Sequence, residues 1–366
     1  MGCCGRTGGG SALSVDAVLQ RAVEGGRLER DELLALYDHA SLLSVGDAAD
    51  RVRERMHPDR VVTYVVDRNI NYTNVCVSRC RFCAFYRDEG HPEAFVLSFD
   101  AIAEKIRALC DAGGTQVLMQ GGLHPSLTIE YFEHLLRFIK ERFAVQLHSL
   151  SPPEIVHIAG ISGLSTAETL RRLHDAGLDS LPGGGAEVLS ETVRQAVSPD
   201  KCSAAEWLTV MEQAHALGMA TTATMMFGHA DSPAERVEHL LAVRALQDRT
   251  GGFTAFIPWT FQPANTAMAD QTPLGGHAYL KTLAISRLAL DNVRNIQASW
   301  VTQGAKVAQL ALRFGANDMG STMMEENVVR AAGVSFRLDR RGISSLVAAA
   351  GFVPRQRDTL YRRIEG

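Results

Sequence analysis

The pattern of hydrophobic and polar positions changes once along the chain, near residue 56. Between Val15 and Met56, apolar residues such as Leu19, Leu33 and Leu42 follow the three-to-four spacing of amphipathic helices. After this segment, short β-rich runs alternate with helical stretches, which is typical of repeated βα units on a parallel sheet. We therefore expect a helical prefix over residues 13–56, an α/β body over 57–325 and a C-terminal extension over 326–366 packed on that body. The Gly-rich residues 1–12 are expected to form a disordered leader.

Eight strands are predicted in the α/β body. They cover Asn69–Val75, Thr115–Gln120, Val145–Leu150, Leu178–Leu181, Thr221–Phe227, Thr254–Trp259, Ile296–Trp300 and Ala311–Phe314. The predicted helices between them cover Asp100–Ala112, Ile129–Arg142, Ser165–Ala176, Ala204–Leu217, Pro233–Thr250 and Leu280–Asn292. Eight units favour a closed, TIM-like (β/α)8 barrel over an open doubly wound sheet, and a partial barrel of six units is the alternative.

Polar and Gly-rich clusters follow the predicted strands, where a barrel enzyme places its site. These clusters are a cysteine loop, Gln120–Pro125, Ser149–Glu154, Pro182–Glu187, Phe227–His229, Trp259–Pro263, Trp300–Gly304 and Gly315–Ser321. Since the carboxyl ends of parallel strands meet at one end of a barrel, every unit is expected to contribute to one pocket.

The cysteine loop carries Cys76, Cys80 and Cys83 in a C-x3-C-x2-C spacing. Three thiols are one short of a closed metal site. A 4Fe–4S cluster with three cysteine ligands keeps one iron open, and that iron can chelate a small molecule and pass an electron to it. Two other interpretations are a zinc site completed by His91 and thiols without a metal.

An aromatic residue, Phe82, precedes the third cysteine, and the whole motif resembles that of the radical S-adenosylmethionine (SAM) superfamily. The resemblance implies that the three thiolates hold a 4Fe–4S cluster, that its open iron takes the amino and carboxylate groups of SAM, and that Phe82 packs near the adenine. A Gly-Gly-Glu motif binds the SAM amino group in this superfamily. Here Leu123 replaces the acid after Gly121 and Gly122. The glycine backbone, with Gln120, is therefore the candidate.

Further candidates come from the other clusters. Glu187 and Ser151 could bind the ribose of the cofactor, or Glu187 its ammonium group, although a solvated surface acid is the competing interpretation. Trp259 and Trp300 offer flat walls for a ring, against the alternative of core packing. Gln262 and Gln303, on the same two loops, are the polar candidates for substrate binding.

Histidines at or near strand ends are candidate bases. Of His124, His148 and His229, the first and last are preferred because each follows a glycine turn, although a lone histidine is more often a structural hydrogen-bonding residue. Asp318 is the third candidate for accepting a proton.

Several longer stretches resemble one radical SAM family, the dehypoxanthine futalosine cyclases of the futalosine route to menaquinone. They are Tyr64–Tyr86, Gln120–Pro125, Phe256–Pro263, Ala298–Gly304 and Gly315–Val328. The resemblance implies that a 5′-deoxyadenosyl radical takes a ribose hydrogen from dehypoxanthine futalosine. The carbon radical then adds to the benzoate ring, and loss of an electron and a proton leaves a spiro-cyclic product. An external one-electron donor such as flavodoxin or ferredoxin is implied as well.

Other functions compete with this interpretation. Aminofutalosine synthase and the FO synthase subunit are related radical SAM enzymes, and FO synthase resembles the chain around Gly315–Glu326. From a different class, the chain could be a zinc-stabilised binding protein on a barrel scaffold. The amount of iron or zinc bound after anaerobic reconstitution separates these classes.

Composition limits the partners and the location. The formal net charge of −4, from 37 basic and 41 acidic residues, indicates neither a nucleic-acid nor an anionic-membrane partner. The chain contains no apolar run of about 18 residues, and its start lacks an apolar signal core, so we expect a cytoplasmic protein. Seven cysteines in a chain of this length do not indicate a disulfide framework. Cys3 and Cys4 fall in the leader.

Overall fold

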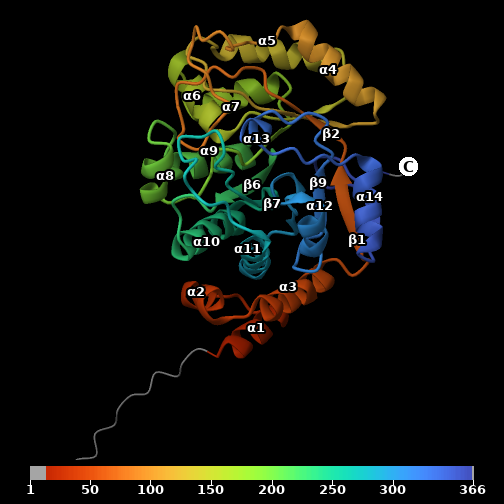
Figure 1. The fold of residues 1–366 in the computed structure, drawn as a ribbon. Helices are drawn as coiled ribbons and strands as arrows, with labels where there is room; N and C mark the ends of the chain where they lie inside the picture. Colours follow the sequence, from red (N-terminus) through yellow and green to blue (C-terminus); the bar gives the residue numbers. More distant parts are fainter. Residues whose placement is uncertain (1–13, 365–366) are drawn as a thin grey trace, which may run out of the picture.

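The computed structural model describes residues 14–364, so the leader expected over residues 1–12 lies outside the described residues. The described chain begins with three helices, α1 (Val15–Val23), α2 (Arg30–His39) and α3 (Leu42–Met56). They lie together at one end of the molecule, beneath α11 (Figure 1). A Cβ on Gly46 of α3 would lie 2.5 Å from the ring of Phe314, so glycine allows this helix to pack closely against the body.

The strands of the body form a ring of parallel neighbours. The larger sheet has the order β2-β3-β4-β5-β6-β7-β8 and the smaller one the order β10-β1-β9. A bridge between Gln297 and Asp318 joins β8 to β9, while β1 leads directly into β2, so the two sheets close on each other. The chain therefore folds as a TIM-like α/β barrel, as the sequence pattern predicted.

Most of the predicted strands are shorter in the structure, whereas β6 and β7 extend slightly beyond their predicted bounds. The strands are β1 Val61–Val65, β2 Asp67–Ile70, β3 Gln116–Met119, β4 Gln146–Ser149, β5 Ser180–Leu181, β6 Ala220–Phe227, β7 Phe253–Thr260, β8 Asn295–Ile296, β9 Asp318–Ser321 and β10 Val353–Gln356. The helices outside this ring are α4 Phe99–Asp111, α5 Ile129–Lys140, α6 Pro152–Ser162, α7 Thr166–Asp175, α8 Glu191–Val197, α9 Ala204–Ala216, α10 Pro233–Thr250, α11 Gly276–Ala289, α12 Trp300–Ala311, α13 Val328–Ala331 and α14 Arg340–Ala349.

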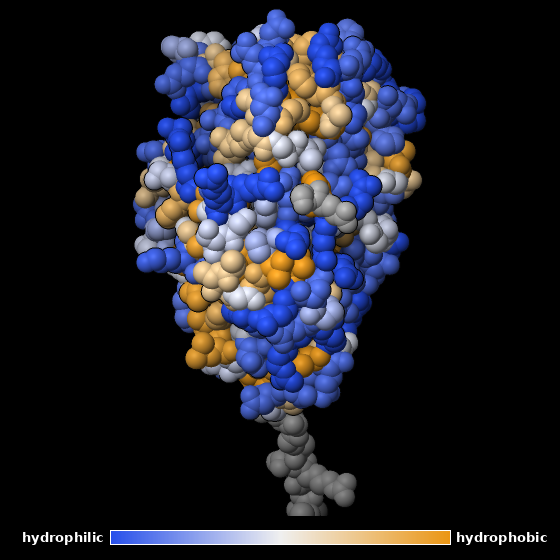
Figure 2. All heavy atoms as spheres, turned by 90° about the vertical axis from the view of Figure 1, so that its right-hand side faces the viewer, coloured by the Kyte–Doolittle hydropathy of each residue, from blue (hydrophilic) through white to orange (hydrophobic). Residues whose placement is uncertain are grey.

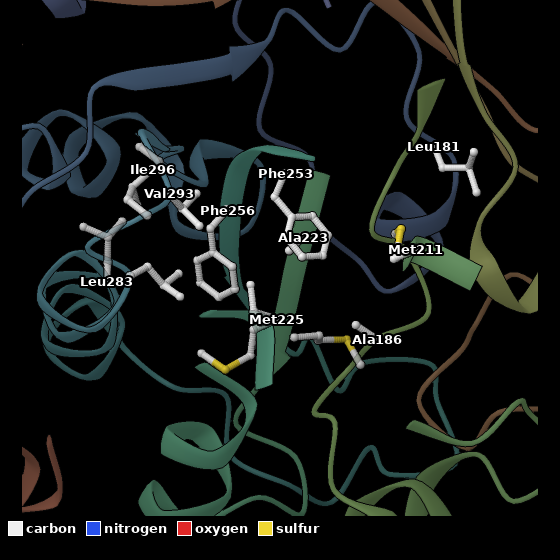
Figure 3. Close-up of a cluster of buried hydrophobic side chains, with 14 of the residues drawn as sticks. Leu181, Ala186, Met211, Ala223, Met225, Phe253, Phe256, Leu283, Val293 and Ile296 are labelled. Carbon is white, nitrogen blue, oxygen red and sulfur yellow. The ribbon is translucent and has the colours of Figure 1, made fainter. Parts of the chain in front are cut away.

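Apolar side chains fill the space between the strands and the helices. In Figure 3, Phe256 of β7 lies beside Met225 of β6 and near Leu283 of α11. These three residues are fully buried. On the face shown in Figure 2, hydrophilic residues predominate and hydrophobic ones form smaller patches. Burial of apolar surface on the outer side of the ring thus holds the barrel together and leaves its axis for a cavity.

The predicted strand at Ala311–Phe314 is wrong. Ala308, Ala311 and Leu312 are buried at helical spacing because α12 runs to Ala311 and ends in a turn. β9 instead closes the ring, and its residues belong to the polar cluster Gly315–Ser321. Its four residues, Asp-Met-Gly-Ser, are all buried and carry polar groups that bond inside the protein, so no hydrophobic pattern marked the strand.

Two other predicted strands were too long at their carboxyl ends. The strand predicted at Asn69–Val75 stops at Ile70, where the Asn71 side chain donates to the Gln120 carbonyl and the backbone turns toward the cysteine loop. The strand predicted at Ile296–Trp300 stops at Ile296, and Trp300 begins α12. Neither β1 nor β10 was predicted. β10 pairs with β1 and brings residues 357–361 of the C-terminal extension to the bottom of the barrel.

Candidate active site

A cavity of about 390 Å³ occupies the interior of the barrel. Its wall contains side chains from the cysteine loop, from the loops after β3, β4, β5 and β8, and from residues 357–361 of the C-terminal extension. Of the candidates from the sequence, it includes Cys76, Cys80, Phe82, Cys83, Gln120, Gly121, Gly122, Ser151, Glu187, Trp259 and Trp300. The structure therefore brings together the metal-binding and cofactor-binding candidates and the two tryptophans around one space.

Backbone hydrogen bonds hold the cysteine loop in place from two sides. The Cys76 N–H donates to the Arg87 carbonyl at 3.1 Å, and the Val77 N–H donates to the Leu123 carbonyl at 3.0 Å. Within the loop, the Cys83 N–H donates to the Cys80 carbonyl at 3.0 Å. The loop thus has a defined shape that does not depend on a disulfide, since all five cysteines within residues 14–364 are unpaired.

The residues around the thiols fit a group with three thiolate ligands. A Cβ on Gly122 would lie 2.1 Å from the Val75 carbonyl oxygen and 2.8 Å from Cys76 Cβ, so only glycine lets the end of β3 lie against the cysteine loop. Burial raises the pKa of Cys80 and Cys83, and the nearby Lys201 opposes this by favouring the thiolates. Three free thiols with a cation beside them suit an iron–sulfur cluster.

A zinc site completed by His91 does not form in this structure. The His91 ring accepts a hydrogen bond from the Glu93 N–H at 3.1 Å, and the residue is exposed. Within residues 14–364, no three His, Cys, Asp or Glu side chains, the three thiols included, lie close enough to hold one metal ion. A 4Fe–4S cluster does not require this, because each thiolate binds a different iron.

Glu154, which the sequence analysis did not select, organises the loops after β3 and β4. One carboxylate oxygen accepts from the Tyr72 hydroxyl at 2.8 Å and from the Gly121 N–H at 3.0 Å. The other accepts from the Ser151 N–H at 2.7 Å and the Ser151 hydroxyl at 2.6 Å. Ser151 and Gly121 are thereby locked to each other. A Ser-Pro-Pro-Glu capping box at the start of α6 is the signal that could have identified Glu154.

A group of buried charges lies after β5. Glu187 accepts a hydrogen bond from the Lys201 ammonium at 2.9 Å, and the Arg194 guanidinium lies 3.6 Å from its other oxygen. The carboxylate is 6% exposed, so the solvated surface acid considered for Glu187 is not what the structure contains. Lys201 and Arg194 were missed because no motif marks them. They lie on the helix and turn that follow Glu187 and fold back against it.

The aromatic and amide candidates differ in their position. Trp259 and Trp300 line the cavity, and the Trp300 indole donates to the Ser321 carbonyl at 3.0 Å. The side chains of Gln262 and Gln303 instead both donate to the Thr260 hydroxyl, at 3.1 and 2.6 Å, and neither belongs to the cavity wall described here. The two tryptophans are thus placed for a substrate contact, while the two glutamines stabilise the loop behind one of them.

The three candidate bases lie outside the cavity wall. His124 accepts from the Ser126 N–H, and His229 bonds to the Met226 carbonyl at 2.8 Å while accepting from the Ala230 N–H. Both oxygens of Asp318 are taken up by the Arg357 guanidinium, at 2.6 and 3.0 Å. Of the histidines considered, His148 is the one that lines the cavity, and burial lowers its pKa to about 3, so its ring is neutral.

Polar groups form the floor of the cavity. Asp67 and Gln116 are the first residues of β2 and β3, and Arg357 reaches the same place from the C-terminal extension. Burial raises the pKa of Asp67 to about 6, while a hydrogen bond from Ser321 opposes the shift. This floor was not predicted, because it joins residues that are far apart in the sequence.

The comparisons with known proteins agree with this fold and site. A model of the radical SAM superfamily matches residues 70–243, and a model of the CofH/MqnC C-terminal region matches residues 250–365. Methylornithine synthase has the same fold, with a TM-score of 0.74 and 19% identity over 92% of this chain and 97% of the other. The FeFe-hydrogenase maturase from Carboxydothermus hydrogenoformans also has this fold, with a TM-score of 0.74 and 18% identity over 95% of this chain and 80% of the maturase. The chain is a radical SAM enzyme.

Full-length relatives place the chain within that superfamily. Cyclic dehypoxanthine futalosine synthase of Halalkalibacterium halodurans is 49% identical, covering 96% of this chain and 95% of the relative. The synthase of the same name from Streptomyces coelicolor is 46% identical, and the match covers 95% of this chain and 88% of that relative. A third relative, from Methanopyrus kandleri, is 5-amino-6-(D-ribitylamino)uracil–L-tyrosine 4-hydroxyphenyl transferase. It is 41% identical, and the match covers 96% of this chain and 98% of the relative. The chain belongs to the family that contains the cyclic dehypoxanthine futalosine synthases.

Proposed function

We propose that the chain cyclises dehypoxanthine futalosine by radical chemistry, with a 4Fe–4S cluster held by Cys76, Cys80 and Cys83. The observation that carries this proposal is the presence of three free thiols in the wall of one barrel cavity. Near-full-length similarity to two synthases of that name supports the choice of substrate. We also propose a role in menaquinone formation, which the resemblance to the cyclases of that route implies.

When bound, the cluster and SAM would supply a 5′-deoxyadenosyl radical for hydrogen abstraction. The residues proposed to hold SAM are Phe82, Gln120, the backbone of Gly121 and Gly122, Ser151 and Glu187. Glu154 supports this set from behind, because it accepts one hydrogen bond from Gly121 and two from Ser151 and is itself held by the Tyr72 hydroxyl. The cofactor would therefore meet a preformed surface rather than a mobile loop.

The apolar part of the cavity wall is suited to holding a substrate away from water. Leu118, Leu123, Ile257, Trp259 and Trp300 contribute apolar surface to its wall. A carbon radical reacts with nearby C–H and S–H groups, so an apolar wall that keeps the two reacting carbons in contact favours ring closure over side reactions. We propose that the tryptophans position the benzoate ring.

We assign the acceptor of the final proton to Glu326 instead of His124, His229 or Asp318. Glu326 lines the barrel cavity that the thiols share, here called the main cavity, and also a second cavity of about 680 Å³ beside α13 and α14. His124, His229 and Asp318 lie outside the wall of the main cavity. Burial raises the pKa of Glu326, although three backbone N–H groups at the start of α13 oppose the shift. A carboxylate with a raised pKa is a better base than an exposed one. We propose that the proton leaves Glu326 through the second cavity.

The variant Glu326→Gln tests this assignment. We expect it to form 5′-deoxyadenosine at a rate close to the wild-type rate but to lose about a hundredfold or more of the cyclised product, the usual effect of a missing general base. Glu325→Gln is the matched control, because Glu325 pairs with Lys105 and Arg68 and faces only the second cavity. Cyclisation by Glu326→Gln at the wild-type rate would contradict the assignment.

A second candidate function comes from the relatives in methanogens. The transferase of Methanopyrus kandleri is named for 5-amino-6-(D-ribitylamino)uracil and L-tyrosine, and it is 41% identical to this chain. Reduced, reconstituted protein should be incubated with SAM and either dehypoxanthine futalosine or the uracil and tyrosine pair. We expect a cyclised product from the first mixture alone. Product from the second mixture alone, or 5′-deoxyadenosine without any cyclised product, would overturn the proposed substrate.

The remaining proposals concern the surroundings of the enzyme. We propose an external one-electron donor such as flavodoxin or ferredoxin, and a cytoplasmic location, where thiols remain reduced. Within residues 14–364 no helix is long and apolar enough to cross a membrane. We also propose residues 13–56, 57–325 and 326–366 as the three structural parts of the chain.

A further inference from the structure

The charged side chains of Glu187, Arg194 and Lys201 lie against the cysteine loop and are 6%, 2% and 14% exposed. The function proposed above gives no role to the two cations. The Lys201 ammonium lies 5.2 Å from the centre of the Phe82 ring, and Phe82 is adjacent to Cys83 in the chain. Lys201, Cys80 and Cys83 share the wall of the main cavity. The cation of Lys201 therefore faces the same space as the thiols.

Two hydrogen bonds tie the cysteine loop to the segment that carries Lys201. The Arg81 N–H donates to the Val197 carbonyl at 2.9 Å, and the Arg81 guanidinium donates to the Ala196 carbonyl at 3.0 Å. The Lys201 N–H donates to the Ser198 carbonyl at 3.1 Å in the turn that follows. The position of the ammonium relative to the thiols is thus set by backbone contacts.

The group carries more positive than negative charge. Glu187 is the single carboxylate between the two cations, and both Arg194 and Glu187 are nearly inaccessible, at 2% and 6% exposure. The Arg194 guanidinium donates hydrogen bonds to the backbone carbonyls of Cys202, Gly185 and Ala186. Arg194 therefore adds a second positive charge to the group, while Glu187 remains the single carboxylate that pairs with both cations. The Lys201 ammonium is held in place by its hydrogen bond to Glu187 at 2.9 Å.

A buried positive charge favours any nearby group in its more negative state, because little water is present to screen the interaction. Each electron that enters a thiolate-bound cluster adds one negative charge. The reduction potential of such a cluster depends on the net charge around it, on hydrogen bonds to sulfur and on exposure to solvent. An excess of positive charge beside the cluster ligands should therefore make reduction easier.

We propose that Lys201 raises the reduction potential of the cluster bound by Cys76, Cys80 and Cys83, and that Glu187 sets the size of this effect by partly neutralising it. The inference rests on the proposed function only in that it requires a bound cluster. It concerns electron entry and is independent of the substrate.

The test compares midpoint potentials of anaerobically reconstituted protein without SAM or substrate, followed by the electron paramagnetic resonance signal of the reduced cluster. Lys201→Met should shift the potential downward, Lys201→Arg should leave it near the wild-type value, and Glu187→Gln should shift it upward. Lys306→Met is the control for loss of a lysine charge, because Lys306 is exposed on α12. It should leave the potential unchanged.

Opposite shifts for Lys201→Met and Glu187→Gln would support the proposal, since general loosening of the site would move both variants in the same direction. Equal potentials for cluster-loaded Lys201→Met and the wild type would overturn it, as would equal shifts for Lys201→Met and Lys201→Arg. If Lys201→Met takes up no iron, the absence of an upward shift in Glu187→Gln overturns the proposal. A wild-type chain that binds about four irons keeps the proposed function intact in all these cases, whereas one that binds none overturns both.

Discussion

Replacing Cys80 by alanine is expected to abolish iron binding at the cluster and to reduce cleavage of SAM by at least about a hundredfold. Changes in residues that only support metal ligands already cost about ten- to a hundredfold, so loss of a ligand itself should cost more. The same result is expected for Cys76→Ala and Cys83→Ala, because the three thiols share one cavity wall. Iron analysis, the visible absorption spectrum and 5′-deoxyadenosine formation measure the effect.

Cys110→Ala and Cys202→Ala are the matched controls for these variants. Cys110 is exposed on α4. Cys202 is buried, but it lies beside Arg194 and outside the cavity wall described here. Both variants should bind iron like the wild type. Full iron binding by Cys80→Ala, or loss of iron in Cys110→Ala, would disprove the proposed ligand set.

The second large effect is expected at Asp318, and it concerns stability. Asp318→Ala leaves the Arg357 guanidinium buried without its carboxylate, which should lower the free energy of unfolding by about 3–5 kcal/mol. Such a loss is a large share of the stability of an ordinary protein. The double variant Asp318→Ala with Arg357→Met should recover much of it, because the buried guanidinium that lost its carboxylate is then removed as well. Urea unfolding followed by far-UV circular dichroism measures all three chains.

The same residue separates a structural role from the catalytic role predicted from the sequence. Asp318 accepts two hydrogen bonds from Arg357 and a third from the Thr63 hydroxyl, and it is fully buried. If it instead accepted the substrate proton, Asp318→Asn would fold with nearly normal stability and lose cyclisation alone. We expect the reverse order of effects, with lower stability as the primary change.

The barrel and its cysteine loop were predictable because their signals are local. A parallel strand repeats apolar positions over a few residues, and the thiols that line the cavity all fall within one short loop. Gly122 was also predicted as a site residue, but only for contact of its backbone with the cofactor. Its lack of a side chain makes room for the Val75 carbonyl and Cys76, in addition to any ligand.

Glu154, Lys201 and Glu326 were missed because their importance depends on what folds against them. Glu154 looks like an ordinary capping residue until Tyr72 and Gly121 donate to it. Asp318 and Arg357 show the same limit in the opposite direction, since a polar residue after a strand suggested chemistry where the fold has an ion pair.

The sequence by itself determined the alternation of strands and helices, the thiol triplet and the family, since each is written in neighbouring residues or in similarity along nearly the whole chain. Only the tertiary structure decided which polar residues face the cavity and which form ion pairs or hydrogen bonds with one another. That choice depends on burial and on partners supplied by distant segments, such as Arg357 meeting Asp318 at the barrel floor. A charged group in the interior must find its partner there, and the identity of that partner is a property of the fold.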